Sequence, residues 1–262
     1  MRAGILLMGS IFCVGCIGQT GGNTVAFPVA AAGPADAISG QPLSFTSGTW
    51  DVLLTQATLH VGAVYLDQSE PVSGGQATGC YLTGTYLAQE TSSLDVDLLN
   101  PALQTFPASA LGITEPPALV GQVWLTGGDV NAASDPTPIL VIAGTAAQNG
   151  TTFPFTGTIT IGSNRQAIGV GTGGGDPICK QRIVTPIPAA VAIQTAGGLL
   201  LRIDPRLYFV NVDFSQLPAD AGTGGYAFSD DPTAPGYAPT GQNLYADVRS
   251  TAPYTFSWTD AL

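Results

Sequence analysis

Turn-forming residues divide this chain into short segments, and this limits the folds that it can adopt. The 262 residues include 34 Gly and 20 Pro, residues that end regular segments or reverse the chain direction. Only 10% of the residues are charged, while 45% are hydrophobic, which is enough to fill a sizeable core. No stretch of 12 residues has a convincing helical period. We therefore expect a globular, mainly β-structure.

The segments between the turns have the composition and period of β-strands. The segments from Trp50 to Thr55 and from Ala57 to Leu66 alternate apolar and polar residues, and their apolar face shifts by one residue, which predicts a bulge near Gln56. Asn149-Gly150 predicts a hairpin turn. Further strands are expected at Gly79 to Leu87, Leu94 to Leu98, Leu119 to Leu125, Ile139 to Ala143, Phe153 to Ile161, Gln181 to Val184, Leu199 to Ile203 and Tyr254 to Trp258.

These strands predict an all-β fold, an antiparallel β-sandwich. One short helix is expected after Asp204-Pro205, where an N-cap residue precedes a proline at the first helical position. We place the sandwich domain at residues 49–262. The preceding residues 16–48 are rich in Gly, Ala, Pro and Ser, which predicts a disordered tether with one early strand around Leu43 to Phe45.

The N-terminus has the features of a lipoprotein signal peptide, residues 1–15. Arg2 is followed by the apolar run from Ala3 to Val14, which is too short to span a membrane. Gly15 is the small residue at the cleavage site, and Cys16 is the predicted lipidation site. Cys13 is a poorer site because it follows the bulky Phe12. The residue after Cys16 is Ile17, not the aspartate that retains many Gram-negative lipoproteins at the inner membrane. We therefore expect a lipid anchor in the bacterial outer membrane.

After removal of the signal peptide, the cysteines that remain in addition to Cys16 are Cys80 and Cys179. An exported chain meets an oxidising compartment, so we expect these two cysteines to form a disulfide. The alternative is two free, buried thiols. The mature chain then contains six Lys and Arg against 18 Asp and Glu, a formal charge of −12. This charge argues against nucleic acid and anionic lipid surfaces as partners, and it favours a cation.

Two families share features with this sequence. The segments from Trp50 to Gly62, from Asp95 to Asn100 and from Leu201 to Phe214 resemble uncharacterised exported lipoproteins of the myxobacterial type. The opening strand pair and the late aspartate-containing strand are also similar in layout to the methanobactin-associated periplasmic MbnP-like β-sandwich family. Some members of that family bind copper through histidines and an oxidised tryptophan, whereas His60 is the only histidine here. The resemblance therefore implies the sandwich fold and export, without a copper site.

Asp95, Asp97 and His60 are the candidate metal ligands. The two aspartates leave the same face of a predicted strand and Asn100 follows at the turn, which is suitable oxygen chemistry for Ca²⁺. In the alternative interpretation Leu94, Val96 and Leu98 face the core and both aspartates face water. The acidic loops Asp129-Val130-Asn131 and Asp230-Asp231 match no complete metal-binding pattern.

No catalytic residues are predicted. The chain has no G-x-S-x-G motif to accompany His60. The glycines from Gly169 to Gly174 satisfy G-x-G-x-x-G, but Asp176-Pro177 follows where a phosphate-binding helix should begin, so we interpret the match as coincidence. Asp204 and Asp213 are expected to cap the short helix or pair with Arg202 and Arg206, with a shallow ligand site as the alternative.

Two groups of aromatic residues are candidates for an aromatic surface. Tyr254, Phe256 and Trp258 alternate along the last strand, where core packing is the favoured interpretation over a sugar-binding platform. Tyr226, Phe228, Tyr237 and Tyr245 lie in a Gly/Pro-rich segment and are the better candidates for an exposed aromatic surface.

Together these features predict a non-enzymatic interaction or structural module of the cell envelope. Its expected partners are the membrane, through the lipid, and an envelope protein or glycan. The first alternative is a protein that binds a metal ion or small ligand, with a hard cation such as Ca²⁺ favoured over copper. A hydrolase is the next alternative.

Overall fold

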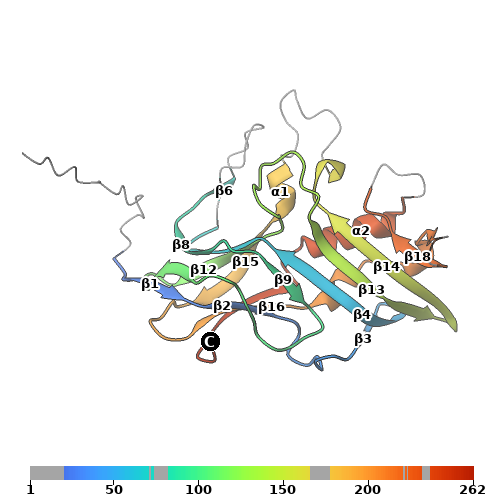
Figure 1. Cartoon of the computed structure of the whole chain (residues 1–262), viewed down its shortest axis with the longest axis horizontal. Helices are drawn as coiled ribbons and strands as arrows, with labels where there is room; N and C mark the ends of the chain where they lie inside the picture. The colour runs from blue at the N-terminus through green and yellow to red at the C-terminus, as the bar shows by residue number, and fades with distance from the viewer. Residues whose placement is uncertain are drawn as a thin grey trace, which may run out of the picture.

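The computed structural model describes residues 21–70, 72–73, 82–165, 178–220, 222, 224–231 and 237–262. Three sheets form the body of the protein (Figure 1). Their strands pack on one hydrophobic core that includes Val29, Leu54, Leu66 and Phe214. Most strand pairs are antiparallel, so the predicted all-β class is confirmed. Among the described residues, no helix is both long enough and apolar enough to span a bilayer.

The six-stranded sheet contains, in spatial order, β1 (Thr24–Phe27), β11 (Ala110–Ile113), β8 (Tyr86–Glu90), β5 (Ala63–Asp67), β12 (Ala118–Trp124) and β15 (Ile183–Val191). The four-stranded sheet contains β10 (Gln104–Thr105), β2 (Val29–Ala32), β16 (Gly198–Ile203) and β19 (Tyr254–Thr259). β2 and β16 are parallel. A separate pair joins β6 (Val72–Ser73) and β7 (Leu82–Thr83).

The seven-stranded sheet contains β17 (Ala219–Asp220), β18 (Gly225–Phe228), β14 (Thr151–Thr160), β13 (Pro138–Gln148), β4 (Trp50–Val61) and β3 (Leu43–Ser47), and β9 (Leu94–Asp97) also pairs with β4. Figure 1 shows β4, β13 and β14 side by side in the right half of the view, with β1, β12 and β15 in the left half. The helical segments are η1 (Ser163–Arg165), α1 (Ile178–Arg182), η2 (Pro205–Phe209), η3 (Phe214–Gln216) and α2 (Pro239–Val248).

The predicted bulge lies in β4. Ala143 of β13 pairs with Gln56, but the next residue, Gly144, pairs with Leu54, so Thr55 is the extra residue. Trp50, Val52 and Leu54 are buried before the bulge, and Ala57, Leu59 and Val61 are buried after it. The extra residue therefore keeps the apolar side of a 12-residue strand facing the core.

The strand expected from Ala57 to Leu66 divides at Gly62. β4 ends at Val61 in the seven-stranded sheet, and β5 begins at Ala63 in the six-stranded sheet. The amide of Gly62 donates to the Trp124 carbonyl at 2.8 Å. A Cβ at this position would lie 2.0 Å from the Thr126 carbonyl oxygen, so only glycine allows this close approach. The chain thus changes sheets at Gly62.

The hairpin at Asn149-Gly150 is confirmed. Both residues have positive φ, 51° and 80°, and they connect the paired strands β13 and β14. The predicted strands at β9, β12, β13, β14, β16 and β19 are also present. The segment expected from Gly79 to Leu87 contains β7 and the start of β8, while residues 79–81 lie outside the described part.

The predicted boundary of the domain is wrong. Residues 24–47, assigned to the tether, form β1, β2 and β3, and all four residues of β2 are buried. The early strand expected at Leu43 to Phe45 is the start of β3. The reason is physical: a strand that is buried throughout and rich in alanine has no alternation of polar and apolar residues to reveal it. The signal peptide, residues 1–15, and Cys16 lie outside the described residues.

The helix predictions need two corrections. The segment after Asp204-Pro205 is a short 3₁₀-helix, η2, as expected near that position, but α2 was not predicted. The first two residues of the strand expected from Gln181 to Val184 belong to α1, and β15 begins only at Ile183.

Candidate ligand-binding face

The predicted metal ligands lie on neighbouring strands, β4 and β9. His60 pairs with Asp95 in the register, and the His60 Nδ1 atom lies 2.6 Å from an Asp95 carboxylate oxygen. Asp97 pairs with Thr58 and accepts a hydrogen bond from the Leu99 amide at 3.0 Å, which shapes the turn after β9. Asp95 and Asp97 are exposed whereas Val96 and Leu98 are buried, as the alternative interpretation expects. Within the described part of the chain, no three His, Cys, Asp or Glu side chains group as metal ligands do.

Asp204 and Asp213 cap 3₁₀-helices. The Asp204 carboxylate accepts from the Arg206 amide at 3.0 Å at the start of η2, and Asp213 accepts from the Ser215 amide at 3.1 Å at the start of η3. The Arg206 guanidinium also forms ion pairs with Asp204 and Asp36, at 2.7 and 2.8 Å. These contacts confirm the structural interpretation of both aspartates.

Cys179 is fully buried in α1, where it packs with Val130, Ile183 and Trp124. Its predicted partner, Cys80, lies outside the described residues, so the disulfide stays a prediction. The glycines from Gly169 to Gly174 also lie outside them.

The aromatic residues divide differently from the expectation. Tyr254 and Phe256 are buried in the core, as predicted. Phe228 and Tyr245 are also buried, so their assignment to an exposed surface is wrong, and only Tyr226 and Tyr237 are half-buried. The Phe228 ring packs against the rings of Phe155 and Phe209. Phe155 is far from Phe228 in the sequence, so the local sequence pattern does not predict this packing.

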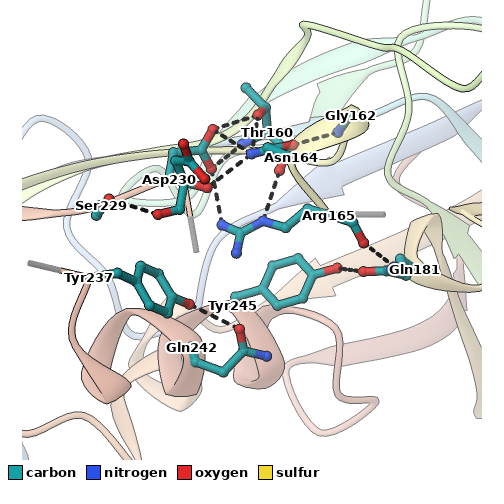
Figure 2. Close-up of polar contacts among 11 residues, drawn as sticks. Thr160, Gly162, Asn164, Arg165, Gln181, Ser229, Asp230, Tyr237, Gln242 and Tyr245 are labelled. Carbon is teal, nitrogen blue, oxygen red and sulfur yellow. Dashed lines mark hydrogen bonds and ion pairs between the residues drawn. The ribbon is translucent and has the colours of Figure 1, made fainter. Parts of the chain in front are cut away.

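A partly buried ion pair lies between η1 and the residues after β18 (Figure 2). The Arg165 Nη2 atom lies 3.1 Å from an Asp230 carboxylate oxygen, and the Arg165 side chain is 2% exposed. Asp230 also accepts from the Thr160 amide at 2.8 Å and from the Asn164 side chain at 3.1 Å. Arg165 neutralises the Asp230 carboxylate and the other donors hydrogen-bond it, so the cluster is a structural contact that joins the residues after β18 to η1 and the end of β14.

Tyr245 extends this cluster to α2. Figure 2 shows the Arg165 guanidinium between Asp230 and the Tyr245 ring, and its carbon lies 4.2 Å from the ring centroid. Arg249 lies over the same ring at 5.0 Å and donates to the carbonyls of Lys180 and Gln181 at the end of α1. Tyr245 donates to Gln181, whose side chain donates to the Arg165 carbonyl. The contacts hold η1, α1 and α2 together.

A different group of polar and aromatic residues lies on the outer face of the six-stranded sheet, the face that points away from the core. Tyr65 pairs with Gln122 on β12, and Asp67 pairs with Tyr86 on β8. Directly paired residues share one face of a sheet, and Trp124 follows Gln122 by two residues on the same face. The rings of Tyr65 and Trp124 are 4.7 Å apart, and those of Tyr65 and Tyr86 are 5.5 Å apart. A row of three half-buried rings therefore crosses β8, β5 and β12.

Asp67 is the buried charge-bearing group of this row. The Gln122 Nε2 atom donates to its Oδ2 atom at 2.6 Å, and the Trp124 indole donates to the Gln122 Oε1 atom at 3.0 Å. The Asp67 Oδ1 atom is buried and has no hydrogen-bond partner among the described residues. Burial raises the pKa of Asp67 to about 6, although the Gln122 hydrogen bond lowers it in part.

A half-open cavity of about 430 Å³ lies at the β8, β11 and β1 end of this sheet. Tyr86 belongs to both the aromatic row and the cavity wall, so the two features adjoin. The described lining residues are neutral: Thr24, Gly84, Thr85, Tyr86, Leu87, Ala88, Gln89, Leu111, Gly112 and Ile113. Leu111 is 53% exposed, and Gln89 is also exposed. We call the cavity and the adjoining aromatic row the outer-face site.

No family model, curated protein or solved structure matches this chain. Sequence reasoning missed the outer-face site, because Asp67 ends an apolar strand and Gln122 interrupts another without any local motif. The available signal was a polar residue at each of two positions where the strand pattern is otherwise apolar.

Proposed function

We propose that this chain is a lipid-anchored, non-enzymatic binding protein of the bacterial cell envelope, and that it binds its ligand at the outer-face site. The observation that carries the proposal is a cavity whose wall includes Tyr86. Tyr86 is the strand partner of Asp67, which has a buried carboxylate oxygen with no hydrogen-bond partner among the described residues. Ligand sites are typically concave and mainly apolar with a few polar groups, and cavities of about 300–1,000 Å³ are usual. The signal features around Cys16 support the anchor and the envelope location.

The binding part of the proposal is tested with one substitution in the cavity and one outside it. Leu111→Arg places a long charged side chain in the cavity, and Val210→Arg is the control because Val210 is similarly exposed, at 58%. We expect native mass spectrometry of protein from the exporting host to show a bound small molecule on the wild type and on Val210→Arg, and none on Leu111→Arg. A wild type without any bound molecule, or retention by Leu111→Arg, contradicts the proposal.

The anchor is tested separately with Cys16→Ser. We expect the wild type to fractionate with membranes and to incorporate labelled fatty acid, because lipid transfer requires the cysteine thiol. The serine variant should lose both properties. A variant that remains lipid-labelled shows that the anchor lies elsewhere.

A further inference from the structure

We infer that the ligand of the outer-face site is a neutral saccharide, which packs on the Tyr86 ring and hydrogen-bonds the Gln89 amide. This inference rests on the proposed function, because it names the ligand class of the same site. Three properties of the described residues lead to it: the charge of the cavity lining, the mixture of apolar and polar groups, and the support behind the aromatic row.

The charge of the lining excludes ionic recognition by the described walls of the cavity. The whole chain carries a formal charge of −11, yet the described lining contains no Asp, Glu, Lys or Arg. An anionic ligand would meet an acidic protein, and no basic side chain among the described lining residues would offset the repulsion. A cationic ligand would find no carboxylate among the described lining residues, because Asp67 pairs with Tyr86 from the neighbouring strand and is not itself part of the lining. A neutral ligand needs no charged partner in the lining, so neither argument counts against it.

The groups that line the cavity suit a molecule with both hydroxyl groups and apolar C–H faces. Leu111 and Ile113 provide apolar surface, while Thr24, Thr85 and Gln89 provide neutral donors and acceptors. A pyranose ring has this dual character, since its hydroxyl groups lie around an apolar C–H surface. An aromatic ring can pack on that surface, and the neighbouring amide can bind the hydroxyl groups.

The aromatic row is supported from one side by hydrogen bonds. Trp124 donates to Gln122, which donates to Asp67, and Asp67 pairs across the strands with Tyr86. The Tyr65 ring contacts both Tyr86 and Trp124. These contacts restrict the rings before any ligand binds, so little side-chain entropy is lost on binding. The strand pairing places Gln89 opposite Tyr65 and Leu111, on the same face as the rings.

The test uses the full mature protein in a zwitterionic detergent that contains no sugar. Saturation-transfer NMR and isothermal titration measure binding of neutral linear hexasaccharides of glucose, mannose and N-acetylglucosamine, with oligogalacturonate as the acidic comparison. We expect a neutral hexasaccharide to bind, and oligogalacturonate to bind at least tenfold more weakly. Equal binding of the acidic oligosaccharide contradicts the charge argument.

Variants then locate the binding. We expect Tyr86→Ala to weaken binding at least about tenfold, Tyr86→Phe to retain most of it, and Gln89→Ala to weaken it severalfold. Tyr226→Ala is the matched control, since Tyr226 is also a half-buried strand tyrosine, and it should bind as the wild type does. Because Gln89 is exposed, its variant tests the site even if Tyr86→Ala fails to fold.

The outcomes separate this inference from the proposed function. If no neutral saccharide binds but native mass spectrometry still shows a molecule lost in Leu111→Arg, the saccharide inference is wrong and the binding site stands. If the wild type carries no molecule and binds no saccharide, both are wrong.

Discussion

At the scale of single residues, Asp67 is a fully buried carboxylic acid with a raised pKa. Burial raises its pKa from an ordinary 3.8 to about 6. In the range between these two values, the folded state retains a proton that the unfolded chain releases. The contribution of Asp67 to the free energy of unfolding is therefore fully present below about pH 4, and it is lost as the pH rises through 6. Asp67 opposes folding at neutral pH, a cost typical of groups retained for binding rather than for stability.

We predict that Asp67→Asn removes this pH dependence. Between pH 5 and pH 8 the wild type should lose roughly 1–1.5 kcal/mol of unfolding free energy through Asp67, whereas the neutral asparagine variant should not. The variant should also be the more stable protein at pH 8. Urea unfolding at the two pH values measures both effects. An equal pH dependence in the two proteins would show that Asp67 is not the responsible group.

His60 gives the second prediction at this scale. Cu(I) prefers thiolate, thioether and imidazole ligands, and the methionines of the chain, Met1 and Met8, both belong to the predicted signal peptide. His60 has one close carboxylate, Asp95, at 2.6 Å. We therefore expect a Cu(I) competition titration to show no tight binding to the wild type, with His60→Ala indistinguishable from it. Stoichiometric tight binding that depends on His60 would establish the copper site.

Local residue roles could be predicted from the sequence, and distant ones could not. The caps formed by Asp204 and Asp213 were predictable because each carboxylate binds an amide two residues further along. Asp67 binds Gln122, which is 55 residues away. That contact depends on strand register, which sequence periodicity alone leaves undetermined.

At the scale of elements, the turn between β13 and β14 depends on the backbone of Gly150. Its φ is +80°, and no atom lies within 4 Å of a Cβ built there. We predict that Gly150→Ala destabilises the protein by about 1 kcal/mol, because the cost comes from the backbone conformation alone. Gly128→Ala is the control: a Cβ there is equally uncrowded and φ is not positive, so stability should change little. Thermal unfolding of both variants makes the comparison.

The elements that sequence reasoning missed owe their structure to tertiary packing. β2 is buried at all four positions and has no alternation. α2 contains Gly241, Asn243 and Asp247, residues of modest or poor helix propensity, and no side chain caps its start at Ala238. It buries Leu244, Tyr245 and Val248, and it packs against η2. The bulge in β4 was predictable because alternation persists on both sides of it.

At the scale of the whole molecule, the predicted disulfide would join the two halves of the chain. Cys179 is fully buried beside Trp124. We expect Cys80 and Cys179 to be linked in exported protein, and the link to stabilise the fold by a few kcal/mol, about 4–5 in the chain-entropy model for a loop of roughly 100 residues. Peptide mapping without reduction measures the linkage, and urea unfolding of Cys80→Ser measures its effect. If both thiols are alkylated readily in the native protein, the predicted disulfide is wrong.

The position of β2 determines when the four-stranded sheet can form. β2 lies between β10, a two-residue strand, and β16, which itself pairs with β19 near the C-terminus. At synthesis rates of about 5–20 residues per second, the ribosome needs on the order of 10–30 seconds to progress from β2 to β16. During that time the nascent chain carries an apolar strand with an incomplete sheet, a species that chaperones recognise. Completion of this sheet therefore has to wait for the synthesis of β16 and β19, and a premature stop codon before β19 should direct the polypeptide to proteolysis.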